Sequence, residues 1–265
     1  IELAGKDTNI VINCVNNVDK LNEVKSIIEE KGSVCETFIG DMGNYSDVQK
    51  MFDMCLQRFG QVDVLINNAG ISVVGLFQDM GENEWHRICN TNIDSVFNCC
   101  HFAVKDMMKR HCGKIINISS VWGLYGASCE VAYSATKGAV NSFTKALAKE
   151  LAPSGIQVNA VACGAIDTEM NGHLSDDDKA ELAEEIPAGR FGSPQPASLI
   201  SSNEKSNKSL LSVLNSTCPS GFNITSYLAM NCLEVSLLFA CLSFGHGSEK
   251  LRYIPVSYTH LRAHE

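Results

Sequence analysis

The regular alternation of short apolar runs with longer amphipathic segments is the feature of this sequence that most constrains its fold. The runs have the length of β-strands, and the segments between them repeat apolar residues at the spacing of an α-helix. Such an alternation predicts an α/β protein whose parallel sheet is covered by helices. The predicted strands are Asn9 to Cys14, Val34 to Ile39, Val62 to Asn67, Lys114 to Ser119 and Gln157 to Ala162.

The segments between the predicted strands carry the start and stop signals of helices. Ser46-Asp47-Val48-Gln49 has the capping-box pattern, and Gly32 and Gly60 follow periodic apolar stretches as helix terminators. Ile1 to Lys6 is interpreted as the end of a helix that Gly5 terminates. The complete helices that the sequence predicts are Val18 to Lys31, Ser46 to Phe59, Glu82 to Lys109 and Ala132 to Leu151.

Small and polar residues follow directly after several of the predicted strands. They are Asp41, Asn68-Ala69-Gly70, Ser120 and Gly164-Ala165. In a parallel sheet covered by helices, ligands bind beyond the carboxyl ends of the strands. We therefore expect these loops to meet at one edge of the sheet and to form a ligand site there.

A serine, a tyrosine and a lysine near the middle of the chain carry the clearest chemistry. Tyr133 and Lys137 are four residues apart, so a helix places both on one face, and Ser120 precedes the tyrosine by thirteen residues. An ammonium nearby favours the phenolate, and we expect Lys137 to lower the pKa of Tyr133. A serine hydroxyl can polarise a carbonyl while the phenol transfers a proton. The set suits interconversion of a carbonyl and an alcohol with hydride from a nicotinamide cofactor; alone, the Tyr-Lys pair also fits an ordinary surface helix.

Charge and cysteine usage narrow the classes of partner. The net charge of −9 argues against nucleic acid and anionic membranes. The twelve cysteines are scattered without C-x-x-C spacing, which argues against a metal site and against a disulfide scaffold, and favours reduced thiols in a cytoplasmic protein. The apolar stretch from Tyr227 to Phe244 contains Asn231 and Glu234, so it is a poor membrane span.

Several motifs occur together in one order. They are Asn67-Asn68-Ala69-Gly70, Asn92 within N-T-N-I-D-S-V-F, Ser120, the Y-S-A-T-K of Tyr133 to Lys137, and V-N-A-V-A-C-G-A-I-D-T-E-M from Val158. With these motifs the chain, up to about residue 194, resembles the short-chain dehydrogenase/reductase family, and most closely its 3-oxoacyl-[acyl-carrier-protein] reductase-like members. The resemblance implies a Rossmann-type, doubly wound parallel sheet with helices on both faces and an oxidoreductase of fatty acid biosynthesis.

The resemblance also implies catalytic roles. Tyr133 would be the acid and base, and Ser120 would position the carbonyl. Lys137 would lower the pKa of the tyrosine and hold the nicotinamide ribose, while Asn92 would hold a water of a proton relay or, as the alternative, be a polar residue at a helix kink. Ser119 is the neighbour most easily confused with Ser120, and the spacing to the tyrosine favours Ser120.

On the cofactor side, the resemblance implies that Asp41 accepts a hydrogen bond from the adenine amino group. Asn68 to Gly70 would line the adenosine ribose, and Ile166 and Thr168 would bind the nicotinamide carboxamide. Cys163 stands where the family usually has proline, a mild departure. The complete implied set is Asp41, Met42, Asn68, Ala69, Gly70, Tyr133, Lys137, Gly164, Ile166 and Thr168.

The residues after the first predicted strand favour NADP as the cofactor, with NAD as the alternative. Relatives that prefer NAD usually place an acidic residue there to bind the ribose 2′-hydroxyl. Here Cys14 to Asn17 contain no carboxylate, and the first is Asp19. No arginine is present nearby to bind a phosphate, so the preference stays a modest one.

The substrate is the least specified part. The most direct expectation is reduction of a 3-oxoacyl thioester by NADPH, with acyl carrier protein as a partner. A dehydrogenase of another small alcohol or sugar is the alternative. The pocket would be flanked by Val73 to Phe77 and by an acidic helical lid at His173 to Ile186. The resemblance also implies a homotetramer for the parent protein.

The two ends depart from the family pattern. The glycine-rich turn T-G-x-x-x-G-x-G and the strand before it do not occur in this sequence. We therefore expect residues 1–196 to form a partial Rossmann domain, and the chain itself to be an impaired or non-catalytic fragment. Residues 197–255 match nothing in the pattern and are interpreted as frame-shifted or chimeric, and residues 256–265 (V-S-Y-T-H-L-R-A-H-E) as a translated sequencing adapter.

Overall fold

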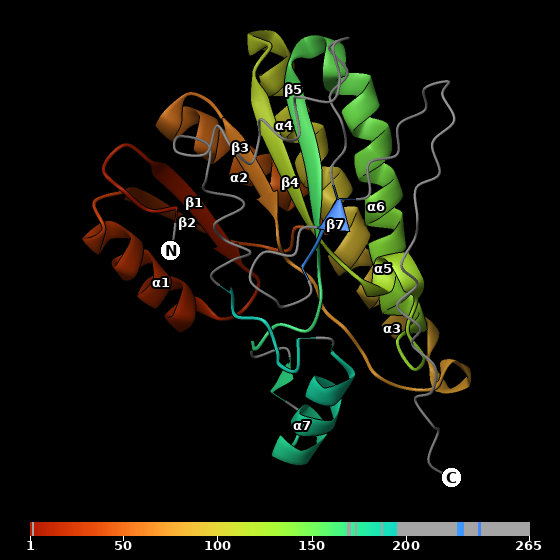
Figure 1. Cartoon of the computed structure of the whole chain (residues 1–265). Helices are drawn as coiled ribbons and strands as arrows, with labels where there is room; N and C mark the ends of the chain where they lie inside the picture. The colour runs from red at the N-terminus through yellow and green to blue at the C-terminus, as the bar shows by residue number, and fades with distance from the viewer. Residues whose placement is uncertain are drawn as a thin grey trace.

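Strands and helices alternate along the chain as the sequence predicts (Figure 1). The computed structural model describes residues 1–194 except 2, 169, 170, 173 and 187, together with residues 227–230 and 238–239. The strands are β1 (Asn9–Cys14), β2 (Val34–Ile39), β3 (Val64–Asn67), β4 (Gly113–Ser120), β5 (Ile156–Cys163), β6 (Tyr227–Met230) and β7 (Leu238–Phe239).

Helices connect the strands and flank the sheets. α6, which follows β4 and α5 in the chain, is the longest of the described helices. None of the helices in the described ranges is long and apolar enough to cross a membrane. The helices are α1 (Val18–Glu30), α2 (Tyr45–Phe59), α3 (Glu82–Cys89), α4 (Ser95–Arg110), α5 (Trp122–Tyr125), α6 (Val131–Leu151) and α7 (Asp176–Glu185), with short turns η1 (Phe77–Asp79), η2 (Asn90–Asp94) and η3 (Ala152–Ser154).

The strands form two separate sheets. β1 pairs with β2, and β3 to β7 form a second sheet in that order. All pairs from β1 to β6 are parallel. Among the described strands, none lies between β1 and β3, so each of these strands keeps one edge without a partner strand. This arrangement is the Rossmann-type sheet expected from the sequence, without its first strand.

β6 and β7 lie in a stretch for which the sequence predicted no strand. β6 continues the sheet beyond β5 in parallel, and β7 runs antiparallel to β6. The rest of residues 197–255, interpreted above as frame-shifted or chimeric, lies outside the described part of the chain. The same holds for residues 256–265, interpreted as a translated adapter.

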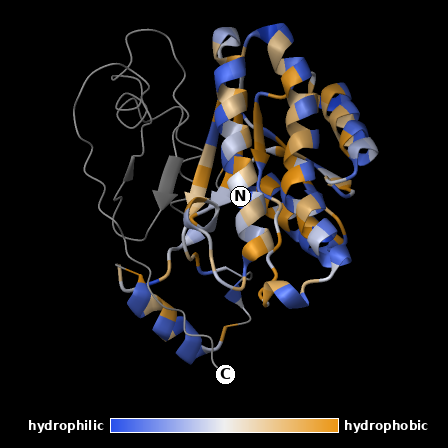
Figure 2. Ribbon diagram, turned by 90° about the vertical axis from the view of Figure 1, so that its right-hand side faces the viewer, coloured by the Kyte–Doolittle hydropathy of each residue, from blue (hydrophilic) through white to orange (hydrophobic). Residues whose placement is uncertain are grey.

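The main hydrophobic core lies between β4 and β5 and the helices α2, α4 and α6. In Figure 2 the helices show hydrophobic stretches beside hydrophilic ones, as expected for helices that cover a sheet on one face only. The buried apolar residues that form this core are Met42, Val48, Phe52, Val96, Cys99, Cys100, Ala103, Met107, Ile115, Val140, Ala148, Leu151, Ile156 and Val158.

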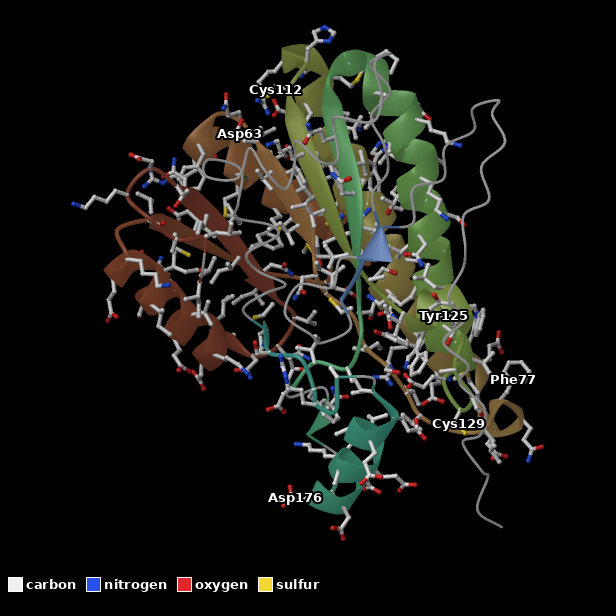
Figure 3. The ribbon with its side chains drawn as sticks, in the orientation of Figure 1. Asp63, Phe77, Cys112, Tyr125, Cys129 and Asp176 are labelled. Carbon is white, nitrogen blue, oxygen red and sulfur yellow. The ribbon has the colours of Figure 1, made fainter. Side chains whose placement is uncertain are left out.

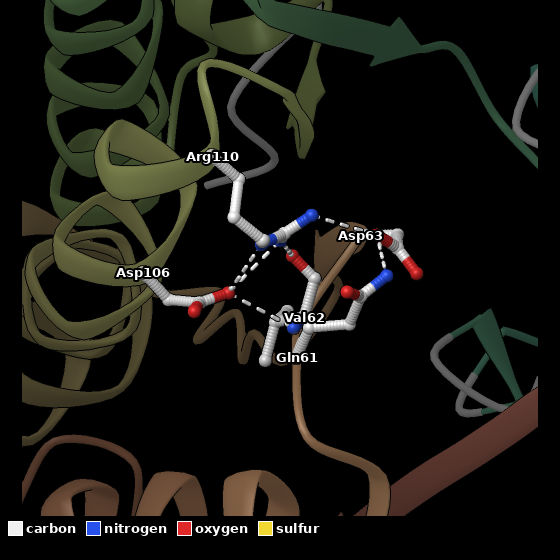
Figure 4. A network of polar contacts seen from close by, with 5 residues as sticks. All are labelled: Gln61, Val62, Asp63, Asp106 and Arg110. Carbon is white, nitrogen blue, oxygen red and sulfur yellow. Dashed lines mark hydrogen bonds and ion pairs between the residues drawn. The ribbon is translucent and has the colours of Figure 1, made fainter.

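The amino end of β3 is connected to α4 through Arg110, the last residue of that helix. The guanidinium donates hydrogen bonds to Asp106 at 2.9 Å, to Asp63 at 3.0 Å and to the carbonyl of Val62 at 2.6 Å (Figure 4). Asp106 also accepts from the backbone N–H of Val62 at 3.1 Å. These contacts fix where α4 ends relative to β3, at the edge of the sheet opposite the carboxyl ends.

Three expectations for the helices were wrong in detail. Ile1 to Lys6 is not the end of a helix, because none of its described residues is helical. α2 is capped by Asn44, whose side chain accepts from the N–H groups of Ser46 and Asp47, so the capping-box reading two residues later was incorrect. The single helix predicted from Glu82 to Lys109 is divided by the wider π-helical turn η2, which separates α3 from α4.

Candidate active site

The carboxyl ends of the strands form one edge of the molecule. Asp63 and Cys112 come directly before β3 and β4 in the upper part of Figure 3, whereas Tyr125 and Cys129, which follow β4, lie lower in the view, on its right-hand side. Asp176, the first residue of α7, lies at the same lower end. The segments that follow the carboxyl end of β4 therefore lie away from the amino ends of β3 and β4.

Ser120, Tyr133 and Lys137 come together at this edge. Ser120 is the last residue of β4, and the other two lie one turn apart on α6. The hydroxyl of Ser120 is hydrogen-bonded to the phenol of Tyr133, and the Lys137 Nζ lies 5.7 Å from the centre of the tyrosine ring. All three are buried, with exposed fractions of 6%, 9% and 4%. The three groups that the sequence singled out thus share one buried site.

Backbone contacts hold α6 close to β4 and α5. The hydroxyl of Ser119 donates to the carbonyl of Lys137 at 3.2 Å, and the Lys137 Nζ donates to the carbonyl of Ile118 at 2.8 Å. A Cβ on Gly123 would lie 2.6 Å from the carbonyl carbon of Lys137, so only glycine fits there. Ser119 therefore holds the helix in place, while its neighbour Ser120 faces the tyrosine.

A buried row of polar side chains adds a second connection between the sheet and α6. Asn67 at the end of β3 donates to Asn117 on β4 at 2.8 Å, and Asn117 donates to Thr144 on α6 at 2.8 Å. Thr144 in turn donates to the carbonyl of Val140. Because Asn117 and Thr144 are fully buried, their polar groups need these hydrogen bonds, and the bonds fix the position of α6 against the sheet.

The expected effect of Lys137 on Tyr133 is not found. Burial raises the pKa of Tyr133, the hydrogen bond from Ser120 lowers it, and the charges of Glu130 and Cys163 raise it. Burial also lowers the pKa of Lys137 to about 8. The prediction was wrong because desolvation penalises the charged form of both groups, and Lys137 is not among the causes that shift the pKa of Tyr133.

Asn92 lies at the centre of the π-helical turn η2 and is 1% exposed. Its Oδ1 accepts from the N–H of Ile71 at 2.8 Å, and its Nδ2 donates to the carbonyl of Ile71 at 2.9 Å and to Thr136 at 3.1 Å. The side chain thus joins the loop after β3 to the helix that carries Tyr133. This position is compatible with both roles considered for Asn92, a residue of a proton relay and a polar residue at a helix kink.

The loop after β3 provides a shape that a side chain would fill. A Cβ added to Gly70 would lie 3.3 Å from the Lys137 Nζ and 3.4 Å from the Asn92 Oδ1. Asn68 and Ala69, just before it, are exposed at the edge. Small residues next to an ammonium and an amide are a suitable wall for a sugar hydroxyl, so this loop fits the nicotinamide cofactor expected from the sequence.

Asp41 and Met42 follow β2 and are held by the η2 and α4 region. The Asp41 carboxylate accepts from the N–H of Gly43 at 2.8 Å and from Asn90 at 3.0 Å. Asn98 donates to the carbonyls of Met42 and Gly43, both at 3.0 Å. Each carboxylate oxygen of Asp41 accepts one of these bonds and has a second lone pair left, so it can still accept from an adenine amino group.

The segment from Gly164 to Thr168 continues β5 beyond the sheet. Ile166 forms a parallel bridge with Gly192, and the carbonyl of Ile166 accepts from Asn171 at 2.7 Å. Thr168 is exposed, while Gly164 and Ile166 are half-buried. These residues lie beyond the end of β5, next to the strand that carries Ser120, and no contact in the described residues joins Thr168 to the tyrosine.

Two residues that were not predicted also belong to this edge. Glu130 directly precedes α6, and the hydroxyl of Ser72 donates to its Oε2 at 2.5 Å. Ser72 follows Ile71, which Asn92 holds. The position of Glu130 three residues before Tyr133 was a signal in the sequence, but its partner 58 residues away was not.

The sequence profile of the short chain dehydrogenase family matches residues 1–179 of this chain. The chain belongs to the short-chain dehydrogenase family. It is accordingly an NAD(P)-dependent oxidoreductase of this family. The motifs and the sheet that suggested this family are thus confirmed by an independent comparison.

Individual short-chain dehydrogenases show the same relationship. The chain is 38% identical over 192 residues to 3-oxoacyl-[acyl-carrier-protein] reductase FabG of Staphylococcus epidermidis, covering 72% of this chain and 79% of that protein. Among solved structures, a gluconate 5-dehydrogenase from Burkholderia cenocepacia in complex with NADP and tartrate matches with a TM-score of 0.65 and 33% identity, over 69% of this chain and 72% of its own. ElxO with NADP bound matches with a TM-score of 0.65 and 31% identity, over 76% and 82%.

Proposed function

We propose that this protein reduces the carbonyl of a 3-oxoacyl thioester to a secondary alcohol with NADPH. The hydrogen bond between the Ser120 hydroxyl and the Tyr133 phenol carries the proposal. It places two hydroxyl groups of different acidity side by side in a buried site, where a carbonyl oxygen can accept from both.

Each side chain of the site has one task. The Ser120 hydroxyl orients the carbonyl oxygen, and the Tyr133 phenol donates the proton that the alkoxide requires. The Lys137 ammonium lies near the tyrosine ring and supplies positive charge where negative charge develops. Asn92 keeps the loop after β3 in contact with α6. The cofactor, when bound, supplies the hydride.

Two observations support NADP as the cofactor. The residues after β1, Cys14 to Asn17, contain no carboxylate that would repel a 2′-phosphate. Two of the similar solved structures contain NADP. The similar 3-oxoacyl-[acyl-carrier-protein] reductases act, by their names, on a 3-oxoacyl group attached to acyl carrier protein, and this supports an acyl thioester as the substrate.

Oxidation of a sugar acid is the second candidate function. It is favoured by the similarity to a gluconate 5-dehydrogenase, which at 33% identity is comparable to the similarity with the reductases. The same Ser120, Tyr133 and Lys137 would serve this reaction in the opposite direction, with the phenolate accepting the proton of the alcohol.

The test compares the two substrates on the full chain. Reduction of an acetoacetyl thioester is followed by the loss of NADPH absorbance, and oxidation of gluconate by the gain of NADPH. We expect the first reaction to be faster and Tyr133→Phe to lower its kcat by about two orders of magnitude or more. Turnover of gluconate without turnover of the thioester would transfer the proposal to the second candidate.

A binding measurement precedes this test, because the glycine-rich turn that holds a pyrophosphate is not in the sequence. NADPH fluorescence during titration with the protein reports binding directly. We expect weak binding, and hence slow turnover, for the chain as it stands. Tight NADPH binding would contradict the expectation that the chain is an impaired fragment.

A further inference from the structure

We propose that Glu130, held by Ser72, is a specificity-determining residue that makes this site select uncharged carbonyl substrates over carboxylates. The inference rests on the proposed carbonyl reduction and adds the substrate class that the site accepts. It depends on where the Glu130 carboxylate lies, on its hydrogen-bond partner and on its distance along α6 from Tyr133.

Glu130 ends the loop that leads into the catalytic helix. Its carbonyl accepts the first helical hydrogen bond, from the N–H of Ser134 at 2.9 Å. Its side chain makes no capping bond to the helix and instead contacts Ser72 on the loop after β3. The carboxylate therefore spans the gap between two loops at the sheet edge, one turn of helix before Tyr133.

A second contact joins the same two loops beside the first. The N–H of Gly75 donates to the carbonyl of Cys129 at 2.8 Å. Cys129, labelled in Figure 3, has φ of 61°, a left-handed conformation that a non-glycine residue rarely adopts. The backbone next to Glu130 is thus held in place on both sides, so its carboxylate has a fixed position rather than a flexible one.

The charge of Glu130 has no counter-ion in the described part of the chain. The ion pairs recorded there all join other residues. The charge of Glu130 acts on Tyr133. Burial is the largest cause that raises the pKa of Tyr133, the hydrogen bond from Ser120 lowers this pKa, and the charge of Glu130 raises it further. Both Glu130 and Ser72 are half-buried, which limits the screening of this charge by water.

These features decide which groups fit beside the reacting carbonyl. The Ser72 hydroxyl has a single proton, which is already donated to Glu130, so it has no proton for a substrate carboxylate. A carboxylate there would face a second carboxylate without a donor between them, and like charges at close range repel. A thioester, an ester or a hydroxyl group carries no such charge, and a hydroxyl could donate to the free Oε1 of Glu130.

The test uses two substrates with the same 3-oxobutanoyl group, the uncharged ethyl acetoacetate and the negatively charged acetoacetate, both with NADPH. The quantity measured is the ratio of kcat/KM for the ester to that for the acid. We expect Glu130→Gln, which keeps the shape and removes the charge, to lower this ratio roughly tenfold or more. Ser72→Ala should lower the ratio less, because the charge remains while its restraint is lost.

Glu150→Gln is the matched control. It removes one negative charge from the exposed far end of the same helix, and we expect the ratio to stay at the wild-type value. If Glu130→Gln and the wild type show the same ratio of kcat/KM for ester and acid, the inference is overturned. If the wild type reduces neither substrate, the proposed function fails, and the inference is then decided by the next measurement alone.

Titration of Tyr133 gives a readout that needs no turnover. The ultraviolet absorbance of tyrosinate is followed with pH, and the difference between the wild type and Tyr133→Phe isolates this one residue. We expect Tyr133 to ionise at a lower pH in Glu130→Gln and at an unchanged pH in Glu150→Gln. Ionisation at the same pH in the wild type and in Glu130→Gln would show that the charge does not reach the site, and would overturn the inference.

Discussion

Burial sets the acidity of Tyr133 in this structure. The phenol is 9% exposed, and desolvation raises its pKa more strongly than the hydrogen bond from Ser120 lowers it. Among the described residues, Ser120 is therefore the group that favours ionisation of Tyr133, in addition to its proposed contact with a substrate carbonyl. Lys137 contributes charge only while it remains protonated, and burial weakens its hold on that proton.

Ser120→Ala should lower kcat by about a hundredfold and shift the ionisation of Tyr133 to higher pH. The substitution removes the donor that stabilises both the phenolate and the carbonyl oxygen. Steady-state kinetics and the tyrosinate titration measure the two effects. Ser120→Thr keeps a hydroxyl and should recover much of the activity; an alanine variant with wild-type kcat would remove Ser120 from the mechanism.

Lys137→Met should change how stability depends on pH. The pKa of Lys137 is about 8 in the folded protein and near the ordinary lysine value of 10.5 in the unfolded chain. Below pH 8 the folded state carries the full cost of a buried ammonium. Between pH 8 and 10.5 the unfolded state binds more protons, so the unfolding free energy of the wild type should rise, by roughly 3 kcal/mol.

Urea unfolding at several pH values measures this dependence. In Lys137→Met the unfolding free energy should rise between pH 8 and 10.5 by roughly 3 kcal/mol less than in the wild type. Below pH 8 the variant should be more stable than the wild type. Parallel pH profiles of the two proteins would show that the amine is not desolvated to the extent that its position indicates.

At the scale of elements, the contact between α5 and α6 positions the catalytic residues. Gly123 on α5 lies directly against the backbone of Lys137, and its carbonyl accepts from Asn141 at 3.1 Å. The site therefore depends on two helices that touch without side chains between them. A methyl group at this contact has no flexible neighbour that can move aside.

Gly123→Ala should destabilise the protein by about 1–3 kcal/mol and lower kcat, because the two helices must separate at Lys137. Gly138→Ala is the matched control on the facing helix, since its Cβ would only touch the carbonyl of Gly123 at an ordinary 3.4 Å. There we expect a small gain in stability from the better helix propensity. Thermal unfolding and kcat measure both variants, and equal effects would contradict the proposed contact.

The elements themselves could be predicted from the sequence, but not all of their ends. The strands β1 to β5 and the helix α6 follow from apolar patterns, and their predicted bounds differ from the observed ones by at most two residues. The cap of α2 was misplaced because Asn44 and Ser46 are both good caps, and only the backbone decides between them. The turn η2 could not be predicted, since a π-helical turn leaves no distinct spacing of apolar residues.

The site could be predicted as a set of residues but not in its electrostatics. Ser120, Tyr133 and Lys137 were found from spacing, because helix geometry fixes which side chains share a face. The raised pKa of Tyr133 was missed, since it depends on burial that no spacing reveals. The contact between Ser72 and Glu130 joins residues 58 positions apart, and only the fold brings them together.

At the scale of the whole molecule, the two sheets differ in how they are supported. β3, β4 and β5 border the large core shared by α2, α4 and α6. The buried apolar residues around β1, α1 and β2 are few, namely Leu21, Ile28 and Cys35, and none of them belongs to that core. The two units should therefore differ in local stability.

Native-state hydrogen exchange should detect this difference. We expect amides of β1, α1 and β2 to exchange through an opening that costs less free energy than the opening that exposes β4, β5 and α6. NADPH should slow exchange in the loops after β2 and β3 if it binds at their carboxyl ends. A single opening free energy for all strands would show that the molecule unfolds as one unit.

The wide turn η2 has a consequence for tolerance to insertion and deletion. A helix turns by about 100° for each residue, so the extra residue in this turn rotates everything that follows on α4. The rotation brings Asn98 to the carbonyls of Met42 and Gly43, and Cys99 and Cys100 into the core. A substitution in this stretch keeps the number of residues, and so keeps the rotation of α4 about its axis. Deletion of a single residue would rotate the apolar side of α4 toward water.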